Sequence, residues 1–438
     1  MEWYWALALM LGLLCLMMAA GLPVAIAFMG VNVVGAAVFL GGEAGLNQMV
    51  RNAMEALTNF SLAPIPLFLF MGEILFHTGV AFKAIDAVDK LIMRLPGRLS
   101  IVSIIGGTIF SSLSGSTIAN TAVLGSVLLP DMLRRGYHPT MAMGPIMATG
   151  GIAMLIPPSA LAVLLGSLAG ISISGLLIAG IVPGLLMSIF FFVYVLIRCT
   201  LNPSLAPAYE VKRISLWQRW QSFMIYVVPL FVIFFVVVGS ILLGWATPTE
   251  SAALGCVAAL VAAAAYRGLT RKSFLKSVRE TAKISVMILF IIVASVTFSQ
   301  ILAFSGATNG LLSLINQAGA EPLMILLSML LILLLLGAFM DQVSMVMITL
   351  PFYIPLAGTA GFDLLWFGVL MLIVMEISFT TPPFGLLIYV MKGVVPKYIT
   401  LSQIYAAAFP FIVLELIVLA LLVIVPDLAT WLPEMIRR

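Results

Sequence analysis

Four polar interruptions of long apolar stretches are the places where this chain could do chemistry. Two are rich in Ser, Thr and Gly and cover residues 111–120 and 149–159, and two lie later, at 337–341 and 376–383. Unwound turns inside an apolar segment expose backbone carbonyls, and Ser, Thr and Asn add neutral oxygens, which together suit a hard cation such as Na⁺. The N-termini of the helices beside such turns carry partial positive charge and suit an anionic carboxylate.

Small polar residues in the first interruption allow two interpretations. As an ion or substrate site they would supply oxygens from a flexible turn. As a packing surface they would let two helices approach closely. The residues concerned are Ser111, Ser114, Ser116 and Asn120.

Asp341 and Glu376 are the acidic residues set most deeply in apolar sequence. A carboxylate inside a membrane is costly and is therefore a functional candidate. Asp341 could support a cation or bind a proton, or it could cap the N-terminus of a half-helix. Glu376 could serve the site, or it could make a structural hydrogen bond that stabilises the break over Thr380–Pro383.

Composition identifies the environment of these residues. Hydrophobic residues make up 63% of the 438 and charged residues only 9%, against about 25% in soluble domains. A water-soluble protein is excluded, and a polytopic membrane protein in contact with lipids is predicted. The net charge of +4 reflects basic loops at the inner face and does not indicate nucleic-acid binding. No phosphate-loop, HExxH or GxSxG pattern occurs, so an integral-membrane enzyme, which would need a catalytic His or Cys cluster, is disfavoured.

The charge-free intervals predict about 10 to 12 crossing or re-entrant helices. Two segments, 99–130 and 322–357, have small or polar residues at their middle. Each arm of about 15 residues would reach roughly 22 Å, short of the ~30 Å apolar layer. We therefore expect two re-entrant hairpins, with a kinked full crossing as the alternative. The mixed apolar and basic segments 83–98 and 269–283 predict amphipathic helices on the inner surface.

Landmarks recur at a nearly constant offset along the chain. Pro23 and Pro248 are 225 positions apart, and so are the prolines of Ile156-Pro157-Pro158 and Thr381-Pro382-Pro383. The first hairpin has basic ends and the second acidic ones, so their bases lie on opposite faces of the membrane. This is typical of inverted-repeat transporters. The predicted repeats are 1–219, with hairpin 99–130 and broken helix 139–170, and 220–438, with hairpin 322–357 and broken helix 364–392. Both chain termini are predicted to be periplasmic.

Several motifs resemble one transporter family. They are Ser114-Gly115-Ser116-Thr117-Ile118-Ala119-Asn120, Ile156-Pro157-Pro158-Ser159, Thr247-Pro248-Thr249-Glu250, Gly337-Ala338-Phe339-Met340-Asp341 and Pro382-Pro383-Phe384-Gly385. Together they resemble the large membrane (M, DctM-like) subunit of tripartite ATP-independent periplasmic (TRAP) transporters, over essentially the whole chain.

The resemblance implies a Na⁺-driven importer of organic acids, such as C4-dicarboxylates or sialic acid, in a bacterial inner membrane. It implies two partners, a periplasmic substrate-binding protein and a separate small four-helix membrane subunit, and an elevator mechanism with a scaffold and a transport domain. Na⁺ is the implied coupling ion, without an organic cofactor. The first implied Na⁺ site comprises Ser111, Ser114, Gly150, Ile152 and Pro157, the second Gly337, Phe379, Thr380 and Thr381, and the substrate cavity Ser116, Asn120, Ser159, Asp341 and Pro382.

An alternative within transport is a stand-alone ion-coupled anion transporter or antiporter of the same inverted-repeat design. It would work without a binding protein. Uptake by the chain reconstituted with Na⁺ and substrate alone would distinguish the two.

Overall fold

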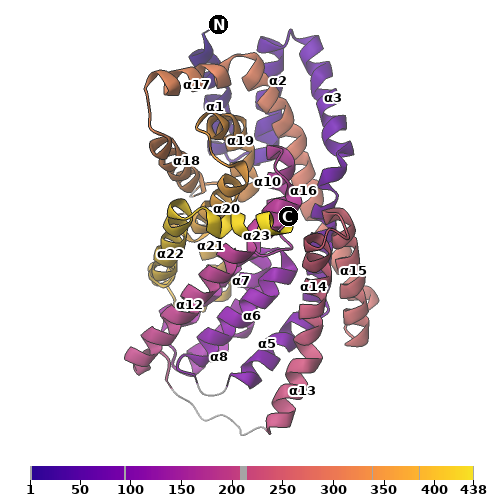
Figure 1. The fold of residues 1–438 in the computed structure, drawn as a ribbon, viewed down its shortest axis with the longest axis vertical. Coiled ribbons are helices and arrows are strands. Elements are labelled where there is room, and N and C mark those ends of the chain that lie inside the picture. The colour runs from indigo at the N-terminus through magenta and orange to yellow at the C-terminus, as the bar shows by residue number, and fades with distance from the viewer. Residues whose placement is uncertain (1, 93–94, 208–214, 338, 384, 438) are drawn as a thin grey trace.

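The protein is an elongated bundle of helices (Figure 1). The computed structural model describes residues 2–92, 95–207, 215–337, 339–383 and 385–437, with Ser114 and Arg437 described by their backbone alone. Within these ranges no strand occurs, and seven helices are long and apolar enough to cross a membrane. One arm of the second predicted hairpin, Gln342–Thr359, is among these seven, whereas Arg98–Leu113 and Pro322–Gly337 are among the shorter apolar helices. The predicted all-α polytopic membrane fold is confirmed.

The first predicted hairpin is present. Helix α6 (Arg98–Ser114) and helix α7 (Thr117–Val127) are joined at Gly115, whose φ of 58° is a left-handed conformation that glycine adopts at little cost. Ser116 caps α7 by accepting a hydrogen bond from the amide of Ala119 (3.3 Å). The short helix α8 (Leu129–Arg134) follows at the base of the hairpin.

The second predicted hairpin is formed by α18 (Pro322–Gly337) and α19 (Gln342–Thr359). In Figure 1 its arms lie in the upper part of the molecule, with α17 (Ala307–Gln317) near its base, whereas α6, α7 and α8 lie in the lower part. The two hairpins therefore enter from opposite ends, as the inverted-repeat prediction requires.

Each hairpin is followed by a broken helix. In the first half α9 (Pro139–Gly151) leads through the 3-10 turn η2 (Ile152–Met154) to α10 (Ala160–Ala169). In the second half α20 (Leu364–Thr380) leads to α21 (Leu386–Val394). The Pro157–Pro158 and Pro382–Pro383 bonds in the two breaks are both cis. The breaks occur where proline cannot donate a helical hydrogen bond.

The order of elements recurs between the halves. Helices α5 (Val80–Leu91), α6, α7, α9 and α10 correspond in order to α17, α18, α19, α20 and α21. Left-handed Gly79 and Gly306 precede α5 and α17. The predicted boundary between residues 219 and 220 stays a prediction.

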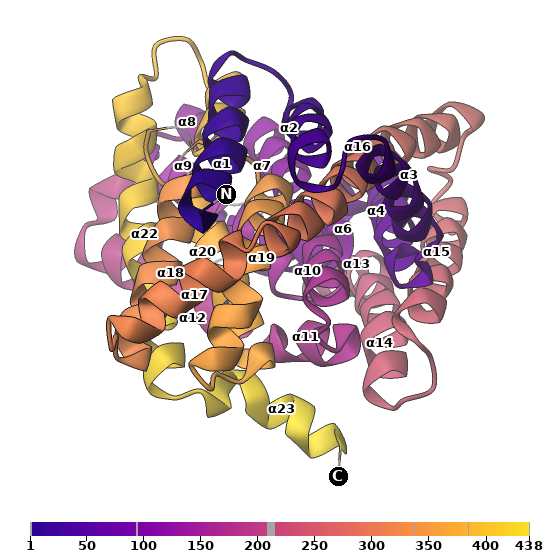
Figure 2. The same ribbon diagram turned by 90° about the horizontal axis from the view of Figure 1, so that it is seen from above.

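Outer helices surround these central elements, and α3, α4, α13, α14 and α15 gather on one side in Figure 2. The 34-residue helix α16 is tied to them by side-chain bonds, such as Ser277 Oγ to the Glu73 carbonyl (3.0 Å) and Asn52 Nδ2 to Gln300 Oε1 (2.7 Å). The remaining bounds are α1 (Trp3–Ala19), α2 (Val24–Phe39), α3 (Glu43–Thr58), η1 (Phe60–Leu62), α4 (Pro64–His77), α11 (Ile173–Ala179), α12 (Ile181–Leu201), η3 (Pro203–Leu205), α13 (Leu216–Tyr226), α14 (Val228–Leu242), α15 (Pro248–Ala265), α16 (Arg271–Phe304), α22 (Leu401–Ile424) and α23 (Asp427–Arg437).

The prediction of a separate surface helix over 269–283 is wrong. Residues 271–283 are the first turns of α16, which continues without interruption into its apolar part. No Gly or Pro interrupts this segment, so the backbone hydrogen-bond ladder runs on and the basic turns extend the spanning helix.

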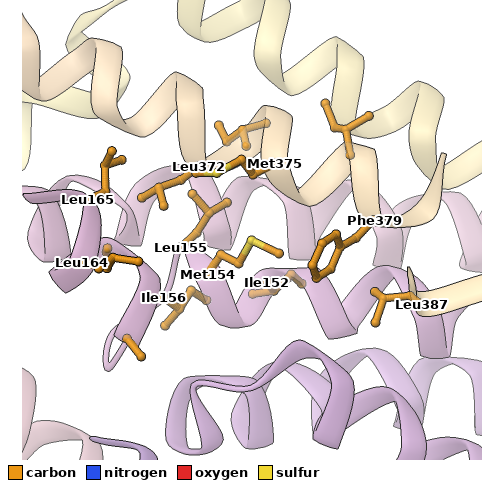
Figure 3. Packing of buried hydrophobic residues seen from close by; sticks show 14 of the residues in the cluster. Ile152, Met154, Leu155, Ile156, Leu164, Leu165, Leu372, Met375, Phe379 and Leu387 are labelled. Carbon is orange, nitrogen blue, oxygen red and sulfur yellow. The ribbon is translucent and has the colours of Figure 1, made fainter. Parts of the chain in front are cut away.

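The core joins the two breaks. Met154, Leu155 and Ile156 of the first half pack beneath Leu372, Met375 and Phe379 of α20 (Figure 3), and all six are buried. Because these side chains interdigitate, the two broken helices form one packed unit.

Candidate functional site

Both hairpin tips and both breaks line a single cavity of about 340 Å³. The first tip supplies Gly115 and Ser116, and the second supplies Asp341. The outer helices α4 and α16 close the cavity with Leu69 and Ile288. The other lining residues are Thr117, Ile118, Met154, Ser159, Ala160, Leu161, Leu164, Ile284, Met287, Gln342, Val343, Phe379 and Leu386.

Four helix N-termini converge on this cavity. Its lining includes the first residues of α7, α10, α19 and α21. Three are capped by the side chains of Ser116, Ser159 and Asp341, each of which accepts a backbone N–H hydrogen bond three residues on, at 3.3, 3.1 and 3.1 Å. Each N-terminus carries partial positive charge and favours an anion, whereas the Asp341 carboxylate in the same lining disfavours one.

The tip of the first hairpin lies directly against the first break. A Cβ on Gly115 would stand 2.9 Å from the carbonyl oxygen of Pro158. Only a residue without a side chain fits at this approach, and the positive φ favours glycine as well. The sequence signal for this contact is the Ser-Gly-Ser tip itself.

Ser111 and Asn120 form a buried hydrogen-bonded cluster with α9. The hydroxyl of Ser111 donates to the Thr149 carbonyl (2.6 Å), and the Asn120 amide nitrogen lies 2.9 Å from the same oxygen and 3.3 Å from the Gly107 carbonyl. Both side chains are fully buried. Oδ1 of Asn120 and Oγ1 of the adjacent Thr121 have no hydrogen-bond partner in the described structure. The cluster lies behind the cavity and does not line it.

The other residues proposed for the first cation site lie beside this cluster. A Cβ on Gly150 would stand 2.2 Å from Thr121 Oγ1 and 3.2 Å from the Thr117 carbonyl, so α7 and α9 are in close contact here. The Ile152 carbonyl accepts hydrogen bonds from the amides of Leu155 and Ile156, both at 3.1 Å. Pro157 is buried. The side chain of Ser114 lies outside the described structure.

The residues proposed for the second cation site are brought together by the second break. A Cβ on Gly337 would lie 2.1 Å from Ser378 Oγ. The carbonyls of Phe379 and Thr381 lie together, since a Cβ on Gly385 would stand 2.7 and 2.8 Å from their oxygens. The hydroxyls of Thr380 and Thr381 donate back to the Ile377 carbonyl, at 3.0 and 2.7 Å. The Thr381 carbonyl also accepts a hydrogen bond from the Gly385 amide (3.0 Å), so an ion here would share that oxygen with the amide and take the Phe379 carbonyl as a second ligand.

Two of the residues proposed for the substrate cavity lie elsewhere. Asn120 is buried behind the cavity, and Pro382 is exposed. Ser116, Ser159 and Asp341 line it. Asp341 also acts as the N-cap of α19, because its carboxylate accepts hydrogen bonds from the amide and hydroxyl of Ser344. Asp341 therefore caps the N-terminus of a helix, which was one of its two predicted roles, and it also lines the cavity.

Glu376 does not make the hydrogen bond considered for it. Its side chain is fully buried, and neither carboxyl oxygen has a hydrogen-bond partner in the described structure. Glu415 of α22, which is not among the residues predicted from the sequence, is in the same situation. The sequence feature that could have identified Glu415 is its place as the single acidic residue in a 24-residue apolar helix.

Comparisons with known proteins find relatives of this chain over nearly its whole length. Residues 11–428 match the family model "Tripartite ATP-independent periplasmic transporter, DctM component". The chain is 30% identical over 441 residues to the C4-dicarboxylate TRAP transporter large permease protein DctM of Rhodobacter capsulatus, covering 97% of this chain and 98% of the relative. It is 28% identical over 419 residues to the sialic acid TRAP transporter large permease protein SiaM of Vibrio cholerae, covering 95% and 96%.

A solved structure shares the fold. MtrF of Neisseria gonorrhoeae, described as one of a class of antimetabolite efflux pumps, superposes with a TM-score of 0.62 at 14% identity, covering 94% of this chain and 95% of that one. At this identity the likeness concerns the arrangement of helices alone.

Proposed function

Because this chain belongs to the DctM family, the large permease component of TRAP transporters, we propose that it imports an organic acid by Na⁺ coupling, together with a substrate-binding protein. The observation that carries the proposal is the convergence of four helix N-termini on one cavity. An anionic carboxylate is the ligand that such an arrangement favours. The names of its relatives support C4-dicarboxylates and sialic acid as substrate classes.

The charge of the cavity supports cation coupling. In its described lining Asp341 is the one carboxylate, and Lys and Arg do not occur there. An anionic substrate would be repelled by this carboxylate unless a cation entered with it. A bound Na⁺ would therefore raise affinity for the substrate, which is the thermodynamic requirement for symport.

Two cation positions follow from the breaks. The first lies between the Ser111–Ser116 tip and the Gly150–Pro157 segment, where Asn120 and Thr121 each leave a buried oxygen without a partner. The second lies where the carbonyls of Phe379 and Thr381 meet near Gly385. Oxygens from unwound backbone are the ligands that transporters use for Na⁺.

The packing supports an elevator mechanism. The hairpins pack on the broken helices around the cavity, and α4 and α16 line the cavity from the outer layer. We propose that the central unit is the transport domain and that the outer helices are the scaffold. The chain would sit in a bacterial inner membrane with both termini in the periplasm and with a small four-helix subunit as its partner.

Reconstitution tests the function. The chain would be placed in liposomes with a small membrane subunit and a binding protein from the same organism, and uptake of labelled succinate and sialic acid would be measured. An inward Na⁺ gradient should drive uptake of one of these acids, and replacing Na⁺ with choline should abolish it.

Omitting the binding protein tests the partner assignment. Loss of uptake in its absence supports the tripartite design. Full uptake without it would instead establish the stand-alone anion transporter. Uptake that is indifferent to Na⁺ would overturn the coupling.

A further inference from the structure

Two acidic side chains in the interior have no role in the proposed cation sites. Glu376 of α20 and Glu415 of α22 are both 0% exposed, and none of their four carboxyl oxygens has a hydrogen-bond donor in the described structure. A buried carboxylate is stabilised only by a cation or by several hydrogen bonds, and neither is provided here. Their burial therefore needs an explanation other than salt bridging.

The two helices are antiparallel. The indole of Trp366, near the start of α20, donates to the Leu422 carbonyl near the end of α22 (2.7 Å). At the other end, the hydroxyl of Tyr405 near the start of α22 donates to the Pro383 carbonyl just after α20 (2.9 Å). These two bonds fix the register between the helices.

The register places the two glutamates at nearly the same level along the helices. Glu376 follows Trp366 by ten residues, and Glu415 precedes Leu422 by seven. At ~1.5 Å per residue, Glu376 and Glu415 lie about 15 and 10 Å along the helix axes from the hydrogen bond between Trp366 and Leu422. Their levels along the axes therefore differ by about one helical turn. Coulomb repulsion from Glu415 is the charge interaction that acts on Glu376.

The surrounding helices offer no countercharge. Helices α9, α10, α11 and α18, which pack against α20, carry no titratable side chain. On the other helices that pack against α20 or α22, the charged side chains lie near helix ends or are exposed. Lys392 of α21 donates to the Ile399 carbonyl, and Arg198 lies in the last turn of α12. Asp427 and Glu434 of α23 are exposed.

The uncharged titratable groups of these helices are mostly engaged elsewhere. Tyr353 donates to the Met329 carbonyl (2.7 Å), and the Tyr194 ring packs edge-on against Phe411. Cys199 lies at the end of α12 beside Gly97, and Tyr389 of α21 is exposed. Asp341 caps α19.

Packing leaves the pair little room for hydration. A Cβ on Gly151 would stand 2.2 Å from Oε1 and 2.3 Å from Cγ of Glu376, so the carboxyl group lies flat against the backbone of α9. Phe411, one turn before Glu415, similarly fills the space over Gly144 of the same helix, 2.5 Å from where a Cβ would be. Protein atoms therefore occupy this side of the Glu376 carboxyl group, where a water would otherwise lie.

We propose that Glu376 and Glu415 form a proton-binding site, in which at least one carboxyl is held as the neutral acid and its O–H donates to the other carboxyl group. The ligand is a proton taken from water, and no other bond changes. Sharing the proton satisfies two of the four oxygens and removes the repulsion between like charges. The pair thereby links α20 and α22 beside Gly151. This inference stands independently of the proposed Na⁺ coupling.

Infrared spectroscopy of the full chain in lipid nanodiscs tests the proposal. A protonated carboxyl group in apolar surroundings gives a C=O stretching band separate from that of a carboxylate. We expect this band at neutral pH in the wild type, with its intensity reduced in both Glu376→Gln and Glu415→Gln. Glutamine has the shape of the neutral acid, so both variants should keep the thermal unfolding temperature of the wild type.

Two controls assign the band. Glu55→Gln changes an exposed glutamate on α3 and should leave the band intact. Glu280→Gln changes a partly buried glutamate that pairs with Lys283 (2.8 Å) and should also leave it intact.

The outcomes decide the proposal. Absence of the band in the wild type at neutral pH would overturn it whatever the variants do. It would equally be overturned if the band persisted unchanged in the Glu376 and Glu415 variants or vanished in Glu280→Gln. If one glutamine variant does not fold, the other and the wild type still decide.

Discussion

Gly337 of α18 and Ser378 of α20 are in direct contact, so that a Cβ on Gly337 would lie 2.1 Å from Ser378 Oγ and 2.2 Å from Ser378 Cβ. The second hairpin is thus seated on the second broken helix through the backbone of one glycine. The contact lies at the end of α18, at the tip where the second cation position is proposed.

Gly337→Ala should separate these helices. We expect the free energy of unfolding to fall by ~1–3 kcal/mol, the usual cost of overpacking, with a matching loss of uptake. Thermal unfolding in nanodiscs measures the effect. Gly337→Ala combined with Ser378→Gly removes the colliding atoms and should recover most of the stability. If the double variant were no more stable than Gly337→Ala, this contact would not be the cause.

Asn120→Leu should uncouple the first hairpin from α9. The substitution removes the hydrogen bonds from Asn120 to the Thr149 and Gly107 carbonyls, at a cost of ~0.5–1.5 kcal/mol for each bond, while Ser111 still donates to the Thr149 carbonyl. We expect Na⁺-dependent uptake to be abolished while the protein still inserts into the membrane. Asn316→Leu, at an exposed position on α17, is the matched control. Wild-type uptake by Asn120→Leu would remove this residue from the site.

Asp341 can be tested for its two roles separately. Asn is as good an N-cap as Asp, so Asp341→Asn should keep the stability of α19 while removing the charge from the cavity. We expect the Na⁺ concentration for half-maximal uptake to rise about tenfold, equivalent to ~1.4 kcal/mol. Asp341→Ala should additionally lose the cap, at ~1 kcal/mol. An unchanged Na⁺ titration of Asp341→Asn would assign the residue to capping alone.

The ion pair at the base of the first hairpin should make stability depend on pH. Arg98 Nη2 lies 2.7 Å from Asp89 Oδ2, and Asp89 is on α5. Burial raises the pKa of Asp89 above its ordinary 3.8, and the charge of Arg98 opposes this shift. The folded state therefore holds the proton of the Asp89 carboxyl group more tightly than the unfolded state does. Protonated Asp89 stabilises the folded state below pH 3.8, and this stabilisation is lost as pH rises through the raised pKa.

Substitution at Asp89 checks this expectation. Asp89→Asn should remove that loss, so its unfolding temperature should vary less with pH than that of the wild type. Arg98→Gln should raise the pKa of Asp89 further and extend the loss to higher pH. Identical pH profiles for the wild type and Asp89→Asn would contradict the assignment.

Local signals made the hairpins and breaks predictable. Gly115 and the paired prolines interrupt a helix through the conformation of their own backbone, so their effect can be recognised without knowing what packs against them. The basic segment 269–283 was mispredicted as a separate surface helix. Its charge pattern alone does not end a helix that lacks Gly or Pro, and residues 271–283 belong to α16.

Partners distant in sequence could not be inferred in this way. Whether Asn120 packs or binds depends on its distance to Thr149, and the meeting of Glu376 and Glu415 depends on the register of α20 against α22. Both are consequences of tertiary packing, which residue type and spacing within one segment do not specify.

The packing of α22 on α9 has a consequence for how the protein can be assembled. Helix α22 belongs to the second half of the chain and α9 to the first, and in the outer layer α16 of the second half likewise packs along α4 of the first. Neither half would therefore cover its own apolar faces if made alone. Gene fragments encoding the two halves should yield a stable product only when they are co-expressed, because each completes the interior of the other.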